Sequence, residues 1–442
     1  MIEITTLLIH LQPFLSTCHF RQLTLVSEAL LMMQGRITIQ GISRWTNQGG
    51  SYRTLQRFFA TRFDWGQLHW LLIKPFVLNA SGVLLIAGDA TVVTKSGKAS
   101  FGLGHFFSSI YSRAVPGLSF QVLSLIEVDR CRSWPLLMEQ MMPKPKPQAV
   151  KAKHKATGKH KNQQPELKGR PKGSKNKNRR DVELNAEMIQ VQRMLKQLLT
   201  RIGNRLKLVY FVYDGAFGNN AAVQMTRQTG LHLISKLRNN AALYFQWQGD
   251  YSGKGAPRRY GERVNYAELP EDCLKSDAIE KNVRTRTYQF TAVHKKFADT
   301  LNVVVILKHN EKNGKTARII LFATDLTLAA DKLVQYYRLR FQIEFNFRDA
   351  KQHWGLEYFM VTHEQPVNNA ANLSLFMVNL SQAMMAQTGE TSVLDLKARY
   401  HGLRYAKEAF KILPKTADVI NFEDWVKKIP VLGSIHEQRM AA

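Results

Sequence analysis

The chain has 442 residues, and its 62 lysines and arginines against 34 aspartates and glutamates give a formal net charge of +28 at pH 7. This length allows two to four domains, and 45% hydrophobic with 22% charged residues is the composition of a folded protein. Three widely separated cysteines with no CxxC pair argue against a disulfide framework and against a thiolate zinc site.

The basic charge favours a polyanionic partner, and nucleic acid before an acidic membrane. A protein that only coats nucleic acid is the alternative, but such chains are usually shorter and poorer in aromatic residues. The N-terminal residues lack a basic segment and a small-residue cleavage signal, and no apolar run reaches the roughly 18 residues of a membrane helix. We therefore expect a cytoplasmic, nucleoid-associated protein with no membrane partner and no small-molecule substrate.

Residues 1–80 are expected to form a helical, DNA-binding N-terminal domain. An amphipathic helix is followed by two short helical segments, 37–47 and 51–63, on either side of a Gly-Gly turn. This order is typical of a helix-turn-helix, in which Arg53 and Arg57 share one helix face. A plain helical bundle with ordinary surface arginines explains the pattern equally well.

Residues 81–238 are expected to form the first part of an α/β core. The continuous apolar run before Asp89 is typical of a strand that is buried on both faces. Residues 100–113 and 117–128 predict two further strands, joined by a turn at the Pro-Gly pair 116–117.

A second buried strand ends at Asp214, and a helix over 219–229 and a strand over 232–237 follow it. Lys236 and Arg238, at the end of this strand, are assigned to phosphate binding. The segment thus repeats the arrangement of a buried strand that ends in an aspartate.

Residues 144–180 are a low-complexity basic tract with fourteen lysines and arginines and one acidic residue, Glu166. Without aromatic residues the tract cannot bury a core, and we expect a disordered basic loop. Arg170 stands in a Gly-Arg-Pro core that resembles an AT-hook, which lies in A·T minor grooves. Nonspecific attraction to phosphates is the favoured role, and a helix over 181–199 follows the tract.

Residues 239–324 are basic and predict a β-rich region. The strands are expected over 264–269, 284–293, 301–310 and 317–326. Residues 325–365 are expected to complete the core with one long helix over 328–352, and residues 366–442 to form a helical region with a possible role in dimerisation.

Two carboxylates, Asp89 and Asp214, follow buried strands and stand next to glycines. Ligand sites in α/β sheets tend to lie at the carboxyl ends of strands, and glycine allows a bulky anion to approach closely. Either aspartate alone has an ordinary explanation as a turn residue. A third acid close to both would favour a functional site over two unrelated turn residues.

The long helix supplies that third acid. At about 100° per residue, four polar residues fall within roughly 60° of one another: Tyr337, Arg340, Glu344 and Lys351. The solvated face is expected on the opposite side, at Gln335, Arg338, Gln342, Asn346 and Asp349. The stripe itself is expected to be flanked by Leu333, Phe341, Phe345 and Phe347. Burying an acid and two bases in apolar surroundings is costly without partners, and metal ions with phosphates would provide them.

Carboxylates suit Mg²⁺, with Mn²⁺ as a possible substitute. Two such ions promote in-line attack at a phosphodiester, one at the nucleophile and one at the leaving oxygen. The sequence therefore predicts a two-ion site at Asp89, Asp214 and Glu344. Arg340 and Lys351 would bind non-bridging phosphate oxygens, and Tyr337 a phosphate or a sugar.

The spacing Tyr337-x2-Arg340-x3-Glu344-x6-Lys351 resembles the Tyr-Arg-Glu-Lys signature of a large group of bacterial insertion-sequence DDE transposases. The contexts Gly-Asp-Ala-Thr at Asp89 and Tyr-Asp-Gly at Asp214 are also similar to that group. The resemblance covers roughly residues 80–365.

The resemblance implies a ribonuclease-H-like core interrupted by a β-rich insertion domain, and cut-and-paste movement of the encoding element. It also implies action on double-stranded DNA, at transposon ends and target, by a homodimer. In some relatives an aromatic residue of the insertion stacks on a flipped base, for which Trp247 is the candidate, although core packing explains this residue equally well. The basic tract is not part of the family pattern.

Three functions are compatible with these features. The first is a transposase that binds terminal inverted repeats, cleaves with Mg²⁺ and joins the 3′-OH ends to target DNA. The second is a metal-dependent nuclease with the same core that cuts without joining, and the third is a non-catalytic DNA-binding regulator.

Overall fold

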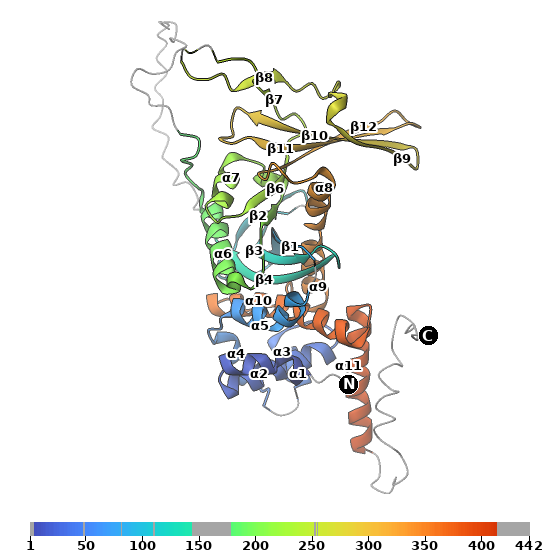
Figure 1. The fold of residues 1–442 in the computed structure, drawn as a ribbon. Coiled ribbons are helices and arrows are strands. Elements are labelled where there is room, and N and C mark those ends of the chain that lie inside the picture. The colour runs from blue at the N-terminus through green and yellow to red at the C-terminus, as the bar shows by residue number, and fades with distance from the viewer. Residues whose placement is uncertain are drawn as a thin grey trace, which may run out of the picture.

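The computed structural model describes residues 4–46, 49–80, 82–108, 111–143, 178–251, 253 and 255–412. The basic tract up to residue 177, with Arg170, lies outside these residues, as does the C-terminal region beyond 412. The described chain forms a large mixed sheet with helices on both faces and a layer of helices packed below it (Figure 1). None of its helices combines the length and the apolar character that crossing a bilayer requires.

The N-terminal region is helical, as the sequence predicts. Four of its helices begin at a residue whose side chain accepts a hydrogen bond from the backbone N–H three positions on, which stabilises the first turn: Ser16, Thr38, Ser51 and Asp64. The elements are α1 (Ile4–Leu8), η1 (Ile9–Phe14), α2 (Thr17–Met32), α3 (Ile39–Trp45), α4 (Tyr52–Ala60) and α5 (Trp65–Leu78). The two predicted short helices are therefore α3 and α4.

Twelve strands of the described chain form one sheet, in the order β2-β3-β1-β5-β6-β12-β11-β10-β7-β8, with β4 on β3 and β9 on β10. The pairs β1–β5 and β5–β6 are parallel, and the others are antiparallel. The strands are β1 (Leu84–Thr94), β2 (Gly104–Ser108), β3 (Arg113–Glu127), β4 (Arg132–Met141), β5 (Tyr210–Tyr213), β6 (His232–Leu237), β7 (Leu243–Gln246), β8 (Tyr260–Arg263), β9 (Leu274–Glu280), β10 (Val283–His294), β11 (Leu301–Asn310) and β12 (Thr316–Ala323).

Several strand predictions are wrong in detail. The Pro-Gly pair at 116–117 lies inside β3, paired with β1 and β2, and the chain reverses nearer Ser112, which has a positive φ of 49°. Residues 264–269 are not a strand, and β4, β7, β8 and β9 were not predicted. The β-rich region is also continuous with the first part of the core, because β12 pairs with β6.

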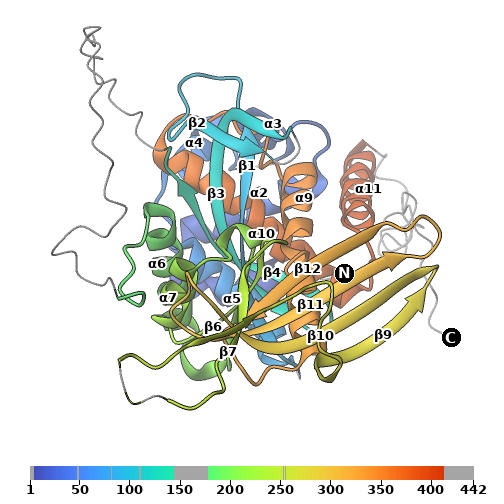
Figure 2. The same cartoon turned by 90° about the horizontal axis from the view of Figure 1, so that it is seen from above.

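Helices cover both faces of the sheet. Helices α6 (Ala186–Ile202) and α7 (Asn220–Arg227) share one apolar cluster with β1, β3, β5 and β6. On the other face, α8 (Ala330–Leu339) shares a cluster with β1, β5, β11 and β12, and α9 (Gln342–His353) packs against β1, β4 and α10. Seen from above, α6 and α7 lie on one side of β1 and β3, and α9 lies on the other side (Figure 2). The remaining elements are α10 (Glu364–Thr388), α11 (Val393–Ile412), η2 (Gly203–Arg205), η3 (Gly215–Phe217) and η4 (Glu271–Cys273).

A buried polar contact joins the helical layer to the sheet. His69 of α5 is 1% exposed, and its Nδ1 lies 2.9 Å from Nδ2 of Asn379 on α10. The Asn379 amide also donates to the backbone oxygen of Pro135 on β4, at 2.7 Å. Burial lowers the pKa of His69 to about 3, so the imidazole is neutral in the folded protein.

The burial of neutral His69 predicts that acid lowers the stability of the folded protein. The unfolded chain takes up a proton on His69 near its ordinary pKa of 6.5, whereas the folded chain does so only near 3. The free energy of unfolding should therefore fall as pH drops below 6.5, by about 2 kcal/mol at pH 5 from this group. Urea denaturation at pH 5 and pH 7.5 should show that His69→Gln loses this part of the pH dependence, whereas the exposed control His10→Gln keeps it. Equal pH dependence in both variants would contradict the assignment.

Candidate active site

The strand register brings Asp89 and Asp214 together. In the parallel pair β1–β5, Gly88 is opposite Tyr213, so the two aspartates occupy the next position on neighbouring strands. Side chains alternate between the faces of a sheet, and both aspartates are two residues beyond members of the cluster under α8, Ala87 and Val212. Both therefore point towards α8 and α9.

The prediction that both aspartates end their strands holds only for one of them. Asp214 directly follows β5, and its side chain accepts a hydrogen bond from the N–H of Ala216, at 3.4 Å. Asp89 lies inside β1, which continues to Thr94 because it stays paired with β3. After Asp214 the chain turns close to β6, and a Cβ on Gly218 would lie 2.0 Å from the backbone oxygen of Lys236, so this turn requires glycine.

The predicted single helix over 328–352 is in fact two helices, which meet at Arg340 and Phe341. Backbone bonds at the junction connect residues three apart, from Phe341 to Arg338 at 3.1 Å and from Glu344 to Phe341 at 3.0 Å. Such 3₁₀-type bonding turns the chain by about 120° per residue instead of 100°. Residues before and after the junction therefore do not share one helical wheel.

This change of phase corrects the predicted helix faces. Asn346, expected in solvent, is buried and donates to Ser133 Oγ at 2.7 Å. Phe341 and Phe345, expected to flank a buried stripe, are 50% and 37% exposed. Leu333 and Phe347 are buried, as predicted.

The three acids converge on one guanidinium group. Arg340 Nη1 lies 2.6 Å from Asp89 Oδ2, and its Nη2 lies 3.2 Å from Glu344 Oε1 and 3.9 Å from Asp214 Oδ1. The Arg340 side chain is 13% exposed, against 23%, 46% and 40% for the side chains of Asp89, Asp214 and Glu344. The structure thus places the three predicted carboxylates around one cation.

Burial and mutual repulsion act on these carboxyl groups. Desolvation raises the pKa of Asp89 and of Glu344 above their ordinary values, and the neighbouring acids add to the increase. Arg340 opposes both shifts through its charge and its hydrogen bonds. A cation between the acids therefore favours their ionised form.

Whether the acids suit a divalent metal ion can be tested on their chemistry. In the part of the chain that the structure describes, no three His, Cys, Asp or Glu side chains are already arranged as metal ligands. At the candidate site, Arg340 contacts the acids. Three convergent carboxylates nevertheless carry the hard oxygen ligands that Mg²⁺ and Mn²⁺ prefer. The donor set fits such an ion.

The other members of the stripe contact protein groups. Burial raises the pKa of Tyr337, and the nearby positive charge of Arg340 opposes the increase. Lys351 Nζ donates to the backbone oxygen of Val92 on β1 at 2.9 Å and lies 3.5 Å from Glu357 Oε1. Phosphate binding by Tyr337, Arg340 and Lys351 stays a prediction.

A second lysine ties β1 to the loop after α9. Lys95 Nζ donates to the backbone oxygens of Glu357 and Phe359, at 3.2 and 2.8 Å, and lies 3.6 Å from the centre of the Phe359 ring. Burial lowers the pKa of Lys95 to about 8. This role of Lys95 could not be predicted from the sequence, because backbone carbonyls accept these bonds whatever residues carry them.

The remaining predicted residues are dispersed. Arg53 and Arg57 are exposed on α4. Lys236, partly buried on β6, directly follows Ser235, whose Oγ donates to the backbone oxygen of Asp214 at 3.0 Å. Arg238 is exposed just beyond the strand.

Trp247 lies far from the three acids. It follows β7, five strands from β5, or about 24 Å along the sheet at roughly 4.8 Å per strand. Arg258 lies 3.8 Å from the centre of its ring, and a Cβ on Gly249 would lie 2.5 Å from the ring. Protein groups therefore already contact this indole.

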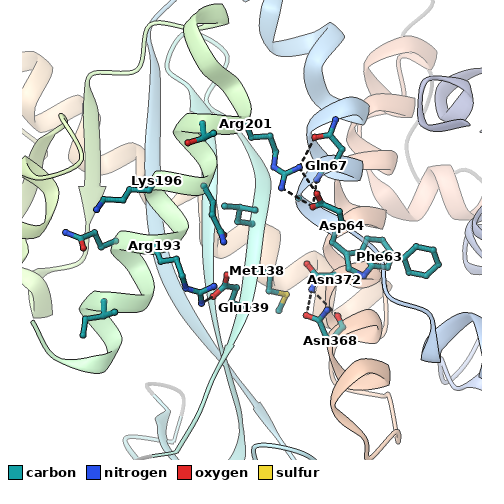
Figure 3. A pocket seen from close by; sticks show the side chains of 17 residues that line it. Phe63, Asp64, Gln67, Met138, Glu139, Arg193, Lys196, Arg201, Asn368 and Asn372 are labelled. Carbon is teal, nitrogen blue, oxygen red and sulfur yellow. Dashed lines mark hydrogen bonds and ion pairs between the residues drawn. The ribbon is translucent and has the colours of Figure 1, made fainter. Parts of the chain in front are cut away.

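A cavity of about 970 Å³ lies away from the acids, between α5, β4, α6 and α10 (Figure 3). Across it, Arg201 of α6 binds both carboxylate oxygens of Asp64, at 3.0 and 3.1 Å, and Gln67 Oε1 at 2.7 Å. Arg193 pairs with Glu139 on another wall. Arg201 thus joins α6 to the start of α5, and Arg193 joins α6 to β4. We assign the cavity no part in the active site.

Carboxylates from two strands and one helix around a single cationic group form a donor set that suits divalent metal ions. In agreement with this, the family model described as "DDE superfamily endonuclease" matches residues 10–296. The chain belongs to this family, whose members act on DNA and generally use divalent metal ions. The match includes Asp89 and Asp214 and ends before Glu344. No curated protein matches the sequence.

The hydrogen bonds of Lys95 yield a prediction for the stability of the protein. Lys95→Met removes two charge-assisted hydrogen bonds between β1 and the loop after α9, and should lower the free energy of unfolding by about 1–3 kcal/mol. Urea denaturation should measure this loss, and hydrogen exchange should become faster over residues 354–362. The exposed neighbour Lys98 is the control, since Lys98→Met should change stability by less than about 0.5 kcal/mol. Equal losses of stability in the two variants would argue against a stabilising role of the Lys95 hydrogen bonds.

Proposed function

We propose that the chain is a DDE transposase, which binds the terminal inverted repeats of its element, cleaves the DNA and joins the 3′-OH ends to target DNA. The convergence of Asp89, Asp214 and Glu344 on one point carries this proposal, together with membership of the DDE endonuclease family. The Tyr-Arg-Glu-Lys spacing supports the transposase subgroup over a nuclease that only cuts.

The three acids would hold two Mg²⁺ ions, or Mn²⁺ in their place, which is the arrangement of two-metal sites that cleave phosphodiesters. Such ions supply Lewis-acid activation of the attacking oxygen and stabilisation of the leaving oxygen. The chain's own task is to keep the three carboxylates ionised and close together. Tyr337 and Lys351, at the edge of the same site, would position the DNA strand.

The exposed arginines of α4, with the net charge of +28, support DNA binding by the N-terminal helices. Lys236 and Arg238 would contact phosphates close to the acids, and Arg170 phosphates elsewhere. The homodimer, the ribonuclease-H-like core and the assignment of the β-rich region as an insertion into that core belong to the same proposal, although the strands of this region continue the core sheet. Base stacking by Trp247 is its least supported part, because Arg258 and Gly249 contact the indole.

Removing one carboxylate charge should abolish cleavage. Asp89→Asn, Asp214→Asn and Glu344→Gln preserve shape, and each should lower the cleavage rate at least about 100-fold while end binding stays within a few-fold. Asp349→Asn, which changes an acid of the same helix α9 outside the cluster, is the control and should cleave normally. Near-normal cleavage by any of the three variants would refute the assignment of that residue.

The terminal repeats needed for this assay would come from sequencing the DNA that flanks the gene. Precut ends mixed with target DNA then separate the three functions. Joined products support a transposase, cutting without joining supports a nuclease, and binding without either supports a regulator.

The role of α4 is tested by the salt dependence of DNA binding. If Arg53 and Arg57 each neutralise a phosphate, replacing both by alanine should reduce the slope of log K against log salt by up to about 2. Fluorescence anisotropy at several salt concentrations measures the slope. Alanine at Arg284 and Arg286, which pair with Asp277 on β9, is the control of equal charge. A slope that α4 and control variants change equally would exclude a specific contact by α4.

A further inference from the structure

Arg340 occupies the position where the carboxylate oxygens of the candidate site converge. Its two terminal nitrogens contact Asp89 Oδ2 and Glu344 Oε1 at hydrogen-bond distance, and Asp214 Oδ1 lies 3.9 Å away. A divalent ion would use lone pairs on these same carboxylates. The guanidinium and the metal ion therefore compete for one set of acceptors.

The fit of Arg340 to this place is incomplete, which suits a replaceable counter-ion better than a permanent structural one. A guanidinium group has five N–H donors, but among the described residues the buried Nε of Arg340 has no hydrogen-bond partner. The contact with Asp214 is longer than a hydrogen bond. The three acids are also 23–46% exposed, so an ion from solution can reach them.

Arg340 also lies at the junction between α8 and α9, where the backbone hydrogen bonds depart from the regular α-helical pattern. It caps α8, its own N–H bonds to the oxygen of Tyr337 at 3.3 Å, and α9 begins two residues later. A stretch of 3₁₀ bonding inside a helical segment often marks a hinge. Displacement of the guanidinium requires only rotation of the Arg340 side chain, which no backbone hydrogen bond of α8 or α9 opposes.

We propose that Arg340 is a built-in competitor of divalent metal ions, which neutralises the three carboxylates before a metal binds and must be displaced from them when it does. The inference rests on the proposed metal site at Asp89, Asp214 and Glu344. In the DNA-free protein, the charge of Arg340 offsets the repulsion among the three carboxylates. The same charge lowers the affinity of the carboxylates for metal ions. An enzyme that acts on DNA would in this way carry little active metal until its substrate is bound.

Metal binding without DNA tests the inference, with no reaction involved. Isothermal titration of the full chain with Mn²⁺ should give at least a tenfold lower Kd for Arg340→Gln than for the unaltered chain. Arg338→Gln, which removes the same charge from an exposed position on α8, is the matched control and should change Kd less than twofold. Adding Asp89→Asn to Arg340→Gln should weaken the tight binding, which locates the ion at the cluster.

The possible outcomes separate the inference from the function on which it depends. Mn²⁺ binding at the cluster with equal affinity in the unaltered chain and Arg340→Gln overturns the competitor role and leaves the metal site in place. Failure of both proteins to bind Mn²⁺, with circular dichroism showing both folded, overturns the metal site and the inference with it. If Arg340→Gln does not fold, Arg340→Lys replaces it, since lysine keeps the charge but cannot bridge several acids with a planar fork. That variant should still bind Mn²⁺ more tightly than the unaltered chain, and equal affinity would contradict the proposal.

Discussion

The repulsion among three carboxylates held within reach of one guanidinium is the constraint on which the site depends. Two unit charges about 4 Å apart interact by roughly 4 kcal/mol at an effective dielectric constant of 20, and three acids multiply the cost. Burial raises the pKa values of Asp89 and Glu344, and this repulsion adds to the increase. Only a rigid framework with a cation at its centre can keep such a cluster ionised, and the structure provides both.

The framework consists of a strand pair and a helix junction fastened to each other. The parallel register of β1 and β5 fixes the distance between the two aspartates, and α9 is anchored by buried Ile343, Phe347 and Ala350. Lysines then bridge the two parts in opposite directions. Lys351 reaches from α9 to the backbone of β1, and Lys95 reaches from the end of β1 to the loop after α9. Glu344 is thereby held against the strand that carries Asp89.

Much of this arrangement follows from sequence patterns that act locally. The apolar runs before Asp89 and Asp214 predicted the buried strands β1 and β5. The spacing around Glu344 predicted a third acid at the same site. The structure brings the Glu344 carboxylate to Arg340 beside the two aspartates, while the catalytic role of the three acids stays a prediction. Patterns that depend on partners distant in the chain were not predictable. The Pro-Gly pair at 116–117 looks like a turn, yet pairing with β1 on one side and β2 on the other holds it in a strand.

The break between α8 and α9 shows a second limit. A helical wheel assumes one constant angle per residue, so it cannot reveal a short 3₁₀ stretch inside a helical pattern. The wheel therefore placed Glu344 correctly among polar partners but assigned Asn346 and Phe341 to the wrong surroundings. Catalytic roles lie beyond this kind of pattern altogether, since they depend on what binds between the acids.

The continuity of the sheet changes how the β-rich region should be understood. Leu333, Tyr336 and Leu339 of α8 pack in one cluster with β11 and β12 as well as with β1 and β5. The strands between the second aspartate and the glutamate thus form part of the surface that fixes α8, and through the junction at Arg340 they fix Glu344. A segment that is only an accessory could be lost without cost to the acids. Here its removal would expose part of the buried face of α8, so the position of the carboxylate cluster depends on the packing of this region too.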